Sequence, residues 1–497
     1  MLIFYKTFPK KGFYMTKNFI VDKYTLDDNQ MKLLLNDENT IVIAGAGSGK
    51  TLTILGKINY LIEKNNINPD NILLISFTNV SVNDVKSRLK YNVNVFTFHK
   101  LAIHILKKNK ISYSLCKTNL LKYIIKEYIH TCEQNEQKTI LKFLDLNISF
   151  SKFLKSLQFE NFCNLIETLI SLYKTNNFNY NNIKKIYFTK IETQILLIIF
   201  KIYKIYVHEK KSTKKLDFDD LIIWSTNYAS QIKLNYKYII IDEFQDTSLI
   251  RLNLIKAIYN NEKSKIIVVG DDWQSIYKFS GCDLNLFLNF SNHFPNTYTI
   301  HLKNTYRNSQ ELLNIASQFI QTNHNQIKKQ LHSSKHNNSP IIFVPYKNKS
   351  NSLKKLLDHI LKMSKDILIL SRNNNDIYKY LDKDIVFENN YIVYRNFKLK
   401  FLTIHKSKGL EAEYTIILNC NNTPLGFPNK IENHKIINKL FPNEKMIYAE
   451  ERRLFYVAIT RCKNSTYIMY DKTNPSVFVK ETKRIVKQNL KKITYFK

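Results

Sequence analysis

One short segment of the chain carries residue types that suit the binding of phosphate groups. The sequence AGAGSGKT (44–51) follows a short apolar run and precedes a stretch whose apolar spacing predicts a helix over residues 52–63. Glycine at positions 45, 47 and 49 lets the backbone curl so that its N–H groups converge on phosphate oxygens at a helix N-terminus. Lys50 would reach the β- and γ-phosphates of a nucleoside triphosphate, and the Thr51 hydroxyl would ligate Mg²⁺. The predicted phosphate-binding loop consists of Ala44, Gly45, Ala46, Gly47, Ser48, Gly49, Lys50 and Thr51, with Ala44 where the strict pattern has glycine.

A second segment supplies the carboxylates that such a loop needs. In IIIDEFQDTS (239–248) an apolar run typical of a buried strand ends at Asp242 and Glu243. Asp242 would hold the metal ion, and Glu243 would orient or deprotonate the attacking water. A paired acidic strand end is also an ordinary feature of surfaces, so this interpretation depends on the presence of both segments. Together they predict the hydrolysis of a nucleoside triphosphate.

A third segment, VVGDDWQSIYKFSGCD (268–283), combines an amide with two aromatic rings. Gln274 follows a strand end, so its amide could sense the γ-phosphate. Tyr277 and Phe279, two residues apart, could stack on nucleic-acid bases, and such stacking contributes about 1–3 kcal/mol per base. Spacing alone is also compatible with a place for these rings in the hydrophobic core.

The charge of the chain favours a polyanionic partner. Its 497 residues include 75 Lys and Arg against 41 Asp and Glu, which gives a formal net charge of +34. Nucleic acid is the leading interpretation and a membrane surface the alternative. The chain has only nine glycines, and only nine of its basic residues are arginines. This bias indicates an AT-rich genome, so part of the lysine excess reflects codon usage, and glycines and arginines remain where the chemistry requires them.

Other features of the composition exclude several protein classes. No apolar run approaches the roughly 18–20 residues that span a bilayer, and the N-terminus lacks the pattern of a secretory signal. Met15 is an alternative start. The six cysteines are scattered without a CxxC pair, so neither a structural metal nor a disulfide framework is predicted. We expect a cytoplasmic protein, associated with the nucleoid if the source is bacterial.

Short β-branched runs alternate with helical patterns along the chain, which predicts an α/β architecture with buried parallel sheets. These runs are residues 41–43, 72–75, 238–241, 266–269, 341–344, 367–370 and 415–418. The first four and the last three form two groups, so we expect two α/β units. The segment 99–215 is rich in Leu, Ile, Lys and Tyr and has neither glycine nor proline, which predicts an inserted helical subdomain.

Six segments occur in the order seen in superfamily 1 helicases: AGAGSGKT, DEFQDTS, GDDWQSIY, NTYRNS (304–309), TIHKSKGLEAEY (403–414) and EERRLFYVAITRCK (450–463). Over about residues 20–475 the chain resembles the UvrD/Rep branch, and residues 270–281 are most similar to its helicase IV group. The resemblance implies two tandem RecA-like domains with ATP between them. Gln30 would read the adenine edge, Tyr306 would stack on the base and Glu411 would hold the ribose. Arg307 and Arg461 would reach the γ-phosphate from the second domain as arginine fingers.

The resemblance also implies a track for single-stranded DNA across both domains. Its residues would be Phe77, Thr78, Asn79, Phe98, His99, Tyr277, Phe279, Thr403 and His405. Aromatic rings that alternate with short polar donors suit sequence-independent binding.

Three departures from the family pattern matter. Leu52 follows Gly-Lys-Thr where several relatives carry an arginine against the base, and Ser280 stands where UvrD and Rep proteins have arginine. Only 96 positions separate Arg307 from Thr403, so the large insertion usual in the second domain is expected to be absent or minimal.

The expected division is a basic N-terminal segment (1–19), a first RecA-like domain (20–98 and 216–300) with a helical insertion (99–215), a second domain (301–475) and a basic C-terminal tail (476–497).

The predicted function is an ATP- and Mg²⁺-dependent DNA helicase or translocase that moves 3′ to 5′ on single strands and acts at junctions with duplex. Repair or replication proteins are candidate partners. Three alternatives stay open: a translocase that displaces proteins but unwinds poorly, an RNA-directed relative, and a non-catalytic DNA-binding subunit with a vestigial ATP site.

Overall fold

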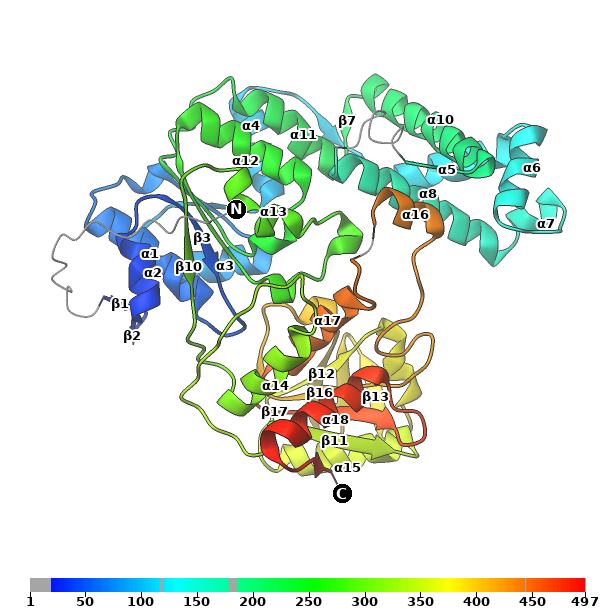
Figure 1. Ribbon diagram of the computed structural model, residues 1–497. Coiled ribbons are helices and arrows are strands. Elements are labelled where there is room, and N and C mark those ends of the chain that lie inside the picture. The colour runs from blue at the N-terminus through cyan, green and yellow to red at the C-terminus, as the bar shows by residue number, and fades with distance from the viewer. Residues whose placement is uncertain (1–18, 117–118, 178–185, 443, 497) are drawn as a thin grey trace.

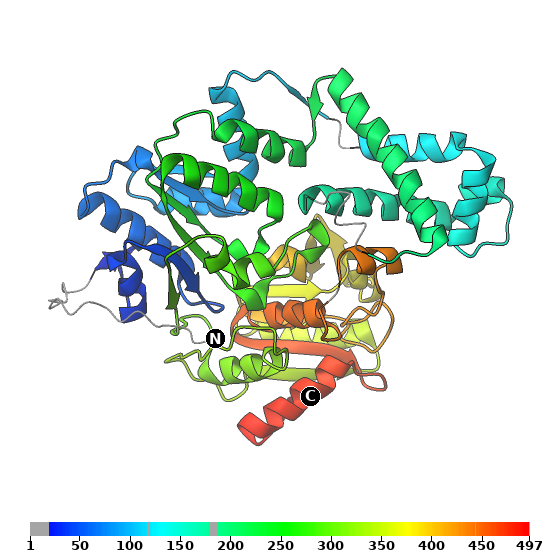
Figure 2. The same cartoon turned by 45° about the horizontal axis from the view of Figure 1, so that its top comes forward.

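Two lobes, each built on a mostly parallel sheet, make up the molecule in the computed structural model (Figures 1 and 2). The structure describes residues 19–116, 119–177, 186–442 and 444–496. The N-terminal segment up to residue 18, with the alternative start Met15, lies outside the described residues.

The first lobe contains a six-stranded, entirely parallel sheet in the order β10-β3-β9-β8-β4-β5. Its strands are β3 (Asn39–Ile43), β4 (Ile72–Ile75), β5 (Asn94–Phe96), β8 (Tyr238–Ile241), β9 (Lys265–Gly270) and β10 (Thr297–His301). Successive side chains of a strand point to opposite faces, so the nearly continuous apolar runs fill a core on each side. In β3, for example, Ile41 and Ile43 join one buried cluster and Val42 joins the other.

Helices cover both faces of this sheet. On one side lie α1 (Asp28–Leu35), α2 (Lys50–Glu63) and α3 (Asn79–Arg88), and on the other α4 (Phe98–Lys108), α11 (Phe218–Ala229), α12 (Leu249–Glu262) and α13 (Asn285–Leu288). A small hairpin, β1 (Ile20–Val21) and β2 (Tyr24–Thr25), precedes α1. Because α4 packs into this core through Phe98, Leu101 and Ile105, the expected start of the helical insertion at residue 99 is wrong.

The helical insertion projects from the first lobe on the short parallel pair β6 (Ser114–Leu115) and β7 (Lys215–Leu216). Its helices are α5 (Leu120–Thr131), α6 (Gln134–Phe143), α7 (Phe150–Leu154), α8 (Leu157–Thr175) and α10 (Lys190–Ser212). They share a hydrophobic core of their own, which also includes Ile436, Ile437 and Leu440 of α16 (Lys435–Leu440). This helix belongs to an excursion from the second lobe and crosses to the insertion (Figure 1). The crossing has no counterpart in the sequence-based prediction.

The second lobe contains an eight-stranded sheet in the order β13-β14-β15-β12-β16-β17-β11-β18. Its strands are β11 (Ile341–Tyr346), β12 (Ile367–Ser371), β13 (Ile385–Glu388), β14 (Tyr391–Tyr394), β15 (Phe397–Thr403), β16 (Ala412–Ile417), β17 (Cys462–Asp471) and β18 (Thr494–Tyr495). Only β13, β14 and β15 pair antiparallel. Between Arg307 and Thr403 the chain forms the helices α14 (Gln310–Ile320) and α15 (Lys349–Leu361), strands β11 to β15 and no helical subdomain.

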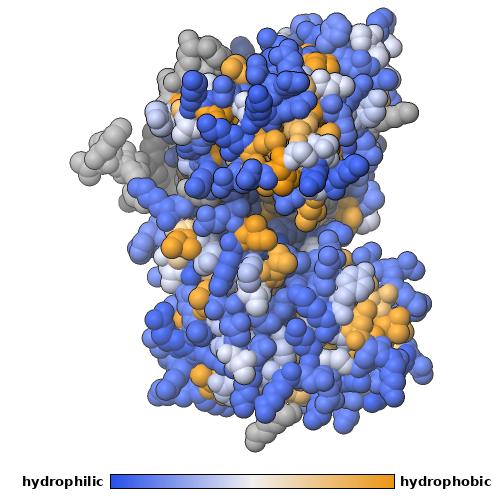
Figure 3. All heavy atoms as spheres, turned by 90° about the vertical axis from the view of Figure 1, so that its right-hand side faces the viewer, coloured by the Kyte–Doolittle hydropathy of each residue, from blue (hydrophilic) through white to orange (hydrophobic). Residues whose placement is uncertain are grey.

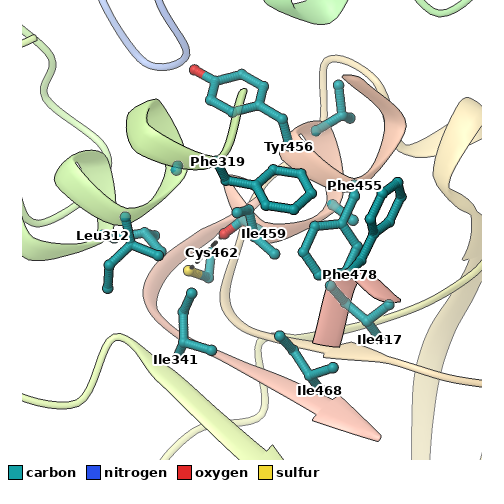
Figure 4. Packing of buried hydrophobic residues seen from close by; sticks show 14 of the residues in the cluster. Leu312, Phe319, Ile341, Ile417, Phe455, Tyr456, Ile459, Cys462, Ile468 and Phe478 are labelled. Carbon is teal, nitrogen blue, oxygen red and sulfur yellow. Dashed lines mark hydrogen bonds between the residues drawn. The ribbon is translucent and has the colours of Figure 1, made fainter. Parts of the chain in front are cut away.

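Aromatic side chains of three helices form the centre of the core on one face of this sheet. Phe319 of α14, Phe455 of α17 (Ala449–Ile459) and Phe478 of α18 (Val477–Leu490) have ring centroids 5.1–5.4 Å apart (Figure 4). The C-terminal segment expected as a basic tail is therefore ordered, and that prediction is wrong. The apolar face of α18 is buried and β18 pairs with β11, while Lys480 and Lys487 are exposed.

Short 3-10 helices hold several of the loops between these elements. They are η1 (Pro69–Asn71), η2 (Phe244–Asp246), η3 (Asp272–Gln274), η4 (Lys278–Ser280), η5 (Phe290–Asn292), η6 (Asn374–Lys379) and η7 (Ile404–Ser407).

In the described part of the chain no helix is long and apolar enough to cross a membrane. The side seen in Figure 3 is mainly hydrophilic, with separate hydrophobic patches on the two lobes.

Candidate nucleotide and nucleic-acid site

The phosphate-binding loop connects β3 to α2 and requires glycine at two positions. Gly47 and Gly49 have φ values of 72° and 76°, the left-handed region that side chains other than glycine rarely adopt. A Cβ atom at Gly47 would also lie 2.6 Å from Cβ of Arg307. The Tyr306 backbone N–H donates to the Gly47 carbonyl oxygen at 2.8 Å. The start of the second lobe is therefore packed directly on the loop.

Lys50 and Glu243 form the central ion pair of the site. The Lys50 Nζ lies 2.7 Å from Glu243 Oε1, and Glu243 follows β8 with a φ of 52°. Burial alone would raise the pKa of the Glu243 carboxyl, but Lys50 and Lys408 together hold it well below its usual range. Burial would likewise lower the pKa of Lys50, but the carboxylates of Glu243, Asp242 and Asp271 together outweigh it and raise that pKa. Both groups are thus charged at neutral pH.

Asp242 and Thr51 are the two expected metal ligands, and their chemistry fits a magnesium ion held largely by phosphates and water. Thr51 lies in the first turn of α2, and Asp242, at the end of β8, adds to the field that raises the pKa of Lys50. Burial, and then the adjacent Glu243, raise the pKa of Asp242 to about 6. Within the described ranges no group of three or more His, Cys, Asp or Glu could hold a metal by itself. Mg²⁺ in nucleotide sites needs only one or two protein ligands beside substrate phosphates.

Gln274 is held in one orientation between the two lobes. Its Nε2 donates to Asp271 Oδ2 at 2.5 Å, and its Oε1 accepts a hydrogen bond from Arg461 Nη2 at 2.8 Å. Arg461 comes from the second lobe, just after α17, and its side chain is buried. Burial, with a smaller effect of Arg307, lowers the pKa of the Arg461 guanidinium to about 9, so it remains charged at neutral pH.

Arg307 and Glu411 contact each other in this structure. The Arg307 Nε lies 2.6 Å from Glu411 Oε2, and Nη1 donates to the carbonyl of Thr460 at 3.4 Å. The expected roles were a γ-phosphate contact for Arg307 and a ribose contact for Glu411. The structure brings both residues to the edge of the loop, but it pairs their charges with each other.

Gln30 and Tyr306, the two residues predicted to contact the base, both lie beside Gly49. The buried Gln30 amide donates weakly to the Ser48 carbonyl at 3.5 Å, and its Oε1 accepts from the Asp27 backbone N–H at 2.9 Å. The Tyr306 hydroxyl donates to Asp27 Oδ2 at 2.8 Å, and its ring lies within 4 Å of a Cβ placed on Gly49. The Gln30 amide thus also serves as half of the capping box of α1.

Lys408 is a part of the site that the sequence-based reasoning missed. Its ammonium contacts Asp246 Oδ2, donates to the Gln274 carbonyl oxygen at 2.7 Å and lies 4.0 Å from Glu243 Oε2. It belongs to the quoted segment TIHKSKGLEAEY, but in a chain so rich in lysine nothing in its residue type distinguished it. Only the fold shows that this lysine of the second lobe is buried among the acids of the first.

Four of the predicted DNA-contacting aromatic residues form a continuous surface. The Phe77 and Tyr277 rings are nearly parallel, with centroids 5.9 Å apart and an interplanar angle of 11°. Tyr277 contacts Phe279 at 6.0 Å, and Phe279 meets the His405 ring of the second lobe at 5.5 Å. Burial, and then Arg372, lower the pKa of His405 to about 4, so its ring is neutral at physiological pH. Phe279 is 62% exposed and is available for stacking.

The other five residues predicted to contact DNA differ in their exposure and in their contacts within the protein. Asn79 is exposed at the start of α3, whereas the Thr78 hydroxyl caps that helix through the Ser81 N–H. His99 packs edge-on against Phe218 with centroids 5.3 Å apart. Thr403 is nearly buried at the end of β15. Phe98 is only 4% exposed and is part of the first lobe's core, so the prediction that it contacts DNA is not supported by its position.

The comparisons with known proteins agree with this arrangement. The UvrD/REP helicase N-terminal domain family matches residues 26–295, and the UvrD-like helicase C-terminal domain family matches residues 389–473. The chain is 27% identical to DNA helicase IV of Escherichia coli (strain K12), over 94% of this chain and 71% of that protein.

Two further relatives match this chain over only part of their own length. The chain is 30% identical to the ATP-dependent DNA helicase Rep of Buchnera aphidicola subsp. Baizongia pistaciae, over 74% of this chain and 52% of that protein. It is 29% identical to the ATP-dependent DNA helicase PcrA of Staphylococcus epidermidis, over 57% of this chain and 38% of that protein. The matched region thus spans about half of Rep and less of PcrA.

Proposed function

Because the chain belongs to the UvrD/Rep family of DNA helicases, we propose that it couples ATP hydrolysis to movement in the 3′ to 5′ direction along single-stranded DNA. Its two sheets are the tandem RecA-like domains of this family, and the nucleotide is ATP. Family membership supports the proposed direction of movement, and the geometry of the site supports the proposed coupling.

The observation that best supports the proposal is a chain of contacts from the ATP site to the aromatic surface. Gln274 contacts Arg461 of the second domain, and Tyr277, three residues later, stacks on Phe77. The Tyr277 hydroxyl also donates to the His405 carbonyl oxygen of the second domain at 2.9 Å. Closure of the domains on ATP would therefore move both halves of the aromatic surface relative to each other.

In the proposed reaction, Lys50 binds the β- and γ-phosphates, and Glu243 orients and deprotonates the attacking water. Lys50 must then exchange its contact with Glu243 for the phosphates, which leaves the carboxylate free for water. Thr51 and Asp242 would hold Mg²⁺, which would neutralise phosphate charge. Arg461 stabilises the charge that develops on the γ-phosphate.

The decisive experiment is the rate of ATP hydrolysis with and without single-stranded DNA, on the wild type and on Glu243→Gln. We expect strong stimulation by DNA, and a loss of about 100-fold or more in kcat in the variant because the amide cannot accept a proton. Nucleotide binding by the variant should persist. A wild-type rate indifferent to DNA would contradict the motor, and a parallel assay with RNA separates an RNA-directed enzyme.

Phe279→Ala should weaken the response to DNA much more than basal hydrolysis. Loss of one stacked base corresponds to about 5- to 150-fold in the DNA concentration that gives half-maximal stimulation. Tyr378→Ala is the matched control, because Tyr378 is 61% exposed and lies on the second domain outside the aromatic surface. Equal losses of basal and DNA-stimulated rates in Phe279→Ala would reject the stacking role.

A second candidate function is a single-strand translocase that displaces bound proteins with little unwinding. It is favoured by the interval from Arg307 to Thr403, which holds no helical subdomain. Strand displacement from a duplex with a 3′ tail separates the two functions. Sustained DNA-dependent hydrolysis without displacement would support the translocase and contradict the helicase.

A further inference from the structure

Lys329 is a buried cation that has no part in the predicted site. It lies in the segment between α14 and β11, and its side chain is 4% exposed. Its Nζ is 2.5 Å from Asp271 Oδ1 and 2.6 Å from Asp272 Oδ1, and it donates to the Ala44 carbonyl oxygen at 2.8 Å. One ammonium group therefore joins the phosphate-binding loop to the segment that precedes Gln274.

The segment that carries Lys329 is itself fixed against the first domain. The Ile327 backbone N–H donates to Asp272 Oδ2 at 2.8 Å, and the Trp273 indole N–H donates to the Ile327 carbonyl oxygen at 3.0 Å. The Leu331 side chain lies so close to Gly45 that a Cβ there would be 2.7 Å away. The contacts of Ile327 and Leu331, which precede and follow Lys329 in the chain, therefore hold Lys329 in place.

The charge of Lys329 is required where it lies. Asp271 and Asp272 are fully buried neighbours. Burial, opposed by Lys329 and reinforced by Asp271, raises the pKa of Asp272. Uncompensated buried charges are strongly unfavourable, so loss of the ammonium would favour protonation or displacement of one carboxylate.

Asp271 in turn determines the orientation of Gln274. A primary amide has a donor side and an acceptor side. Because Asp271 Oδ2 accepts a hydrogen bond from Gln274 Nε2, the Gln274 Oε1 faces Arg461. The Asp271 backbone N–H also donates to Gln245 Oε1 at 3.0 Å, and Gln245 Nε2 donates to Glu243 Oε2 at 2.5 Å. Both the arginine finger and the catalytic carboxylate are thus connected to Asp271.

We propose that Lys329 is a positioning residue for ATP hydrolysis: it holds the Asp271 carboxylate in place, so that Gln274 holds Arg461 and Gln245 holds Glu243. The inference rests on the proposed ATPase activity. It adds a lysine from the segment between the domains to the set of groups that align the phosphate-binding loop with the arginine finger.

The first test compares Lys329→Met with Lys328→Met, the same substitution at the exposed neighbouring position. Lys329→Met should lower the DNA-stimulated kcat by about 10- to 100-fold with little change in the KM for ATP, because misplacement of catalytic groups mainly affects the transition state. Lys328→Met should retain the wild-type rate. Lys329→Arg should restore part of the activity, because it keeps a positive charge beside Asp271 and Asp272.

A further pair of variants separates positioning from stability. Lys329→Met combined with Asp272→Asn keeps the net charge of the cluster and leaves Asp271 without its cation. Unfolding temperatures should recover toward the wild type in this double variant, while kcat remains low. Recovery of kcat together with stability would overturn the proposal.

A double-mutant cycle tests the route through Gln274. If Lys329 acts mainly through this amide, Lys329→Met should add little to the loss in a Gln274→Ala background, about 3-fold or less. If the fold-losses in kcat of the two substitutions simply multiplied in the double variant, the proposal would be overturned.

A readout independent of hydrolysis comes from Trp273, whose ring centre is 4.7 Å from Lys329 Nζ. Trp224 is the other of the two tryptophans, so Trp224→Phe isolates the Trp273 emission. A non-hydrolysable ATP analogue should change this emission, and Lys329→Met should abolish the change while the analogue still binds. An unaltered change in the variant contradicts the positioning role. If the wild-type protein binds the analogue and shows the change in Trp273 emission but does not hydrolyse ATP, the result contradicts the proposed function instead.

Discussion

Lys50→Ala is expected to lower kcat for ATP hydrolysis by at least about 1000-fold, because it removes the ammonium that contacts the transferred phosphate. The structure adds a second effect. Without Lys50, the nearest cation to Glu243 is Lys408, whose Nζ lies 4.0 Å from Glu243 Oε2, so the pKa of Glu243 should rise. Steady-state ADP release in the presence of saturating single-stranded DNA measures the loss.

The matched control for this prediction is Lys64→Ala. Lys64 is exposed and directly follows the helix that Lys50 begins, so its removal changes the net charge equally but leaves the site intact. Lys50→Ala should still bind single-stranded DNA with nearly wild-type affinity, since the aromatic surface is untouched. Retention of half the wild-type rate would show that the loop does not bind the reacting nucleotide.

Arg461→Ala is expected to cause a loss of about 10³- to 10⁵-fold in kcat, the range typical of an arginine finger. The substitution leaves Gln274 Oε1 without its donor and removes the hydrogen bonds to the Leu410 and Val457 carbonyl oxygens at 3.2 and 3.1 Å. Binding of ATP should change far less, because Arg461 acts on charge that develops in the transition state. Single-turnover hydrolysis separates the chemical step from binding.

Two further variants make this result interpretable. Arg461→Lys should recover only a small part of the rate, because lysine keeps the charge but lacks the planar fork that reaches Gln274 and the phosphate together. Arg484→Ala, an exposed arginine of α18 in the same domain, should be neutral. A kcat for Arg461→Ala within tenfold of the wild type would exclude the finger role.

The losses of kcat predicted for Lys50→Ala and Arg461→Ala arise from residues in different domains, which contacts within the site connect. Lys50 belongs to the first domain and Arg461 to the second. The intervening groups Glu243, Gln245, Asp271 and Gln274 connect them. In the proposed function, alignment of the domains is part of the catalytic machinery, and this would be the physical basis for coupling hydrolysis to domain movement.

The sequence by itself determined the elements whose signals are local. The buried strands of both sheets appear as short β-branched runs, because strands covered on both faces carry almost no polar residues. The phosphate-binding loop was evident from its glycines, since two of them need the left-handed conformation that the structure contains. DEFQD, GDDWQ and EERRLFYVAITRCK were recognisable because they stand in the order seen in superfamily 1 helicases, and that resemblance implied the role of Arg461.

Only the tertiary structure decided which residues are combined across the chain. Lys329 and Lys408 are two lysines in a lysine-rich sequence, and only their burial against carboxylates distinguishes them. Phe98 belongs to the core, and α16 of the second domain docks on the helical insertion of the first, because apolar faces that look independent in sequence are buried together in space. The basic tail became α18 and β18 for the same reason: the burial of one face of a helix outweighs the charge carried on the other.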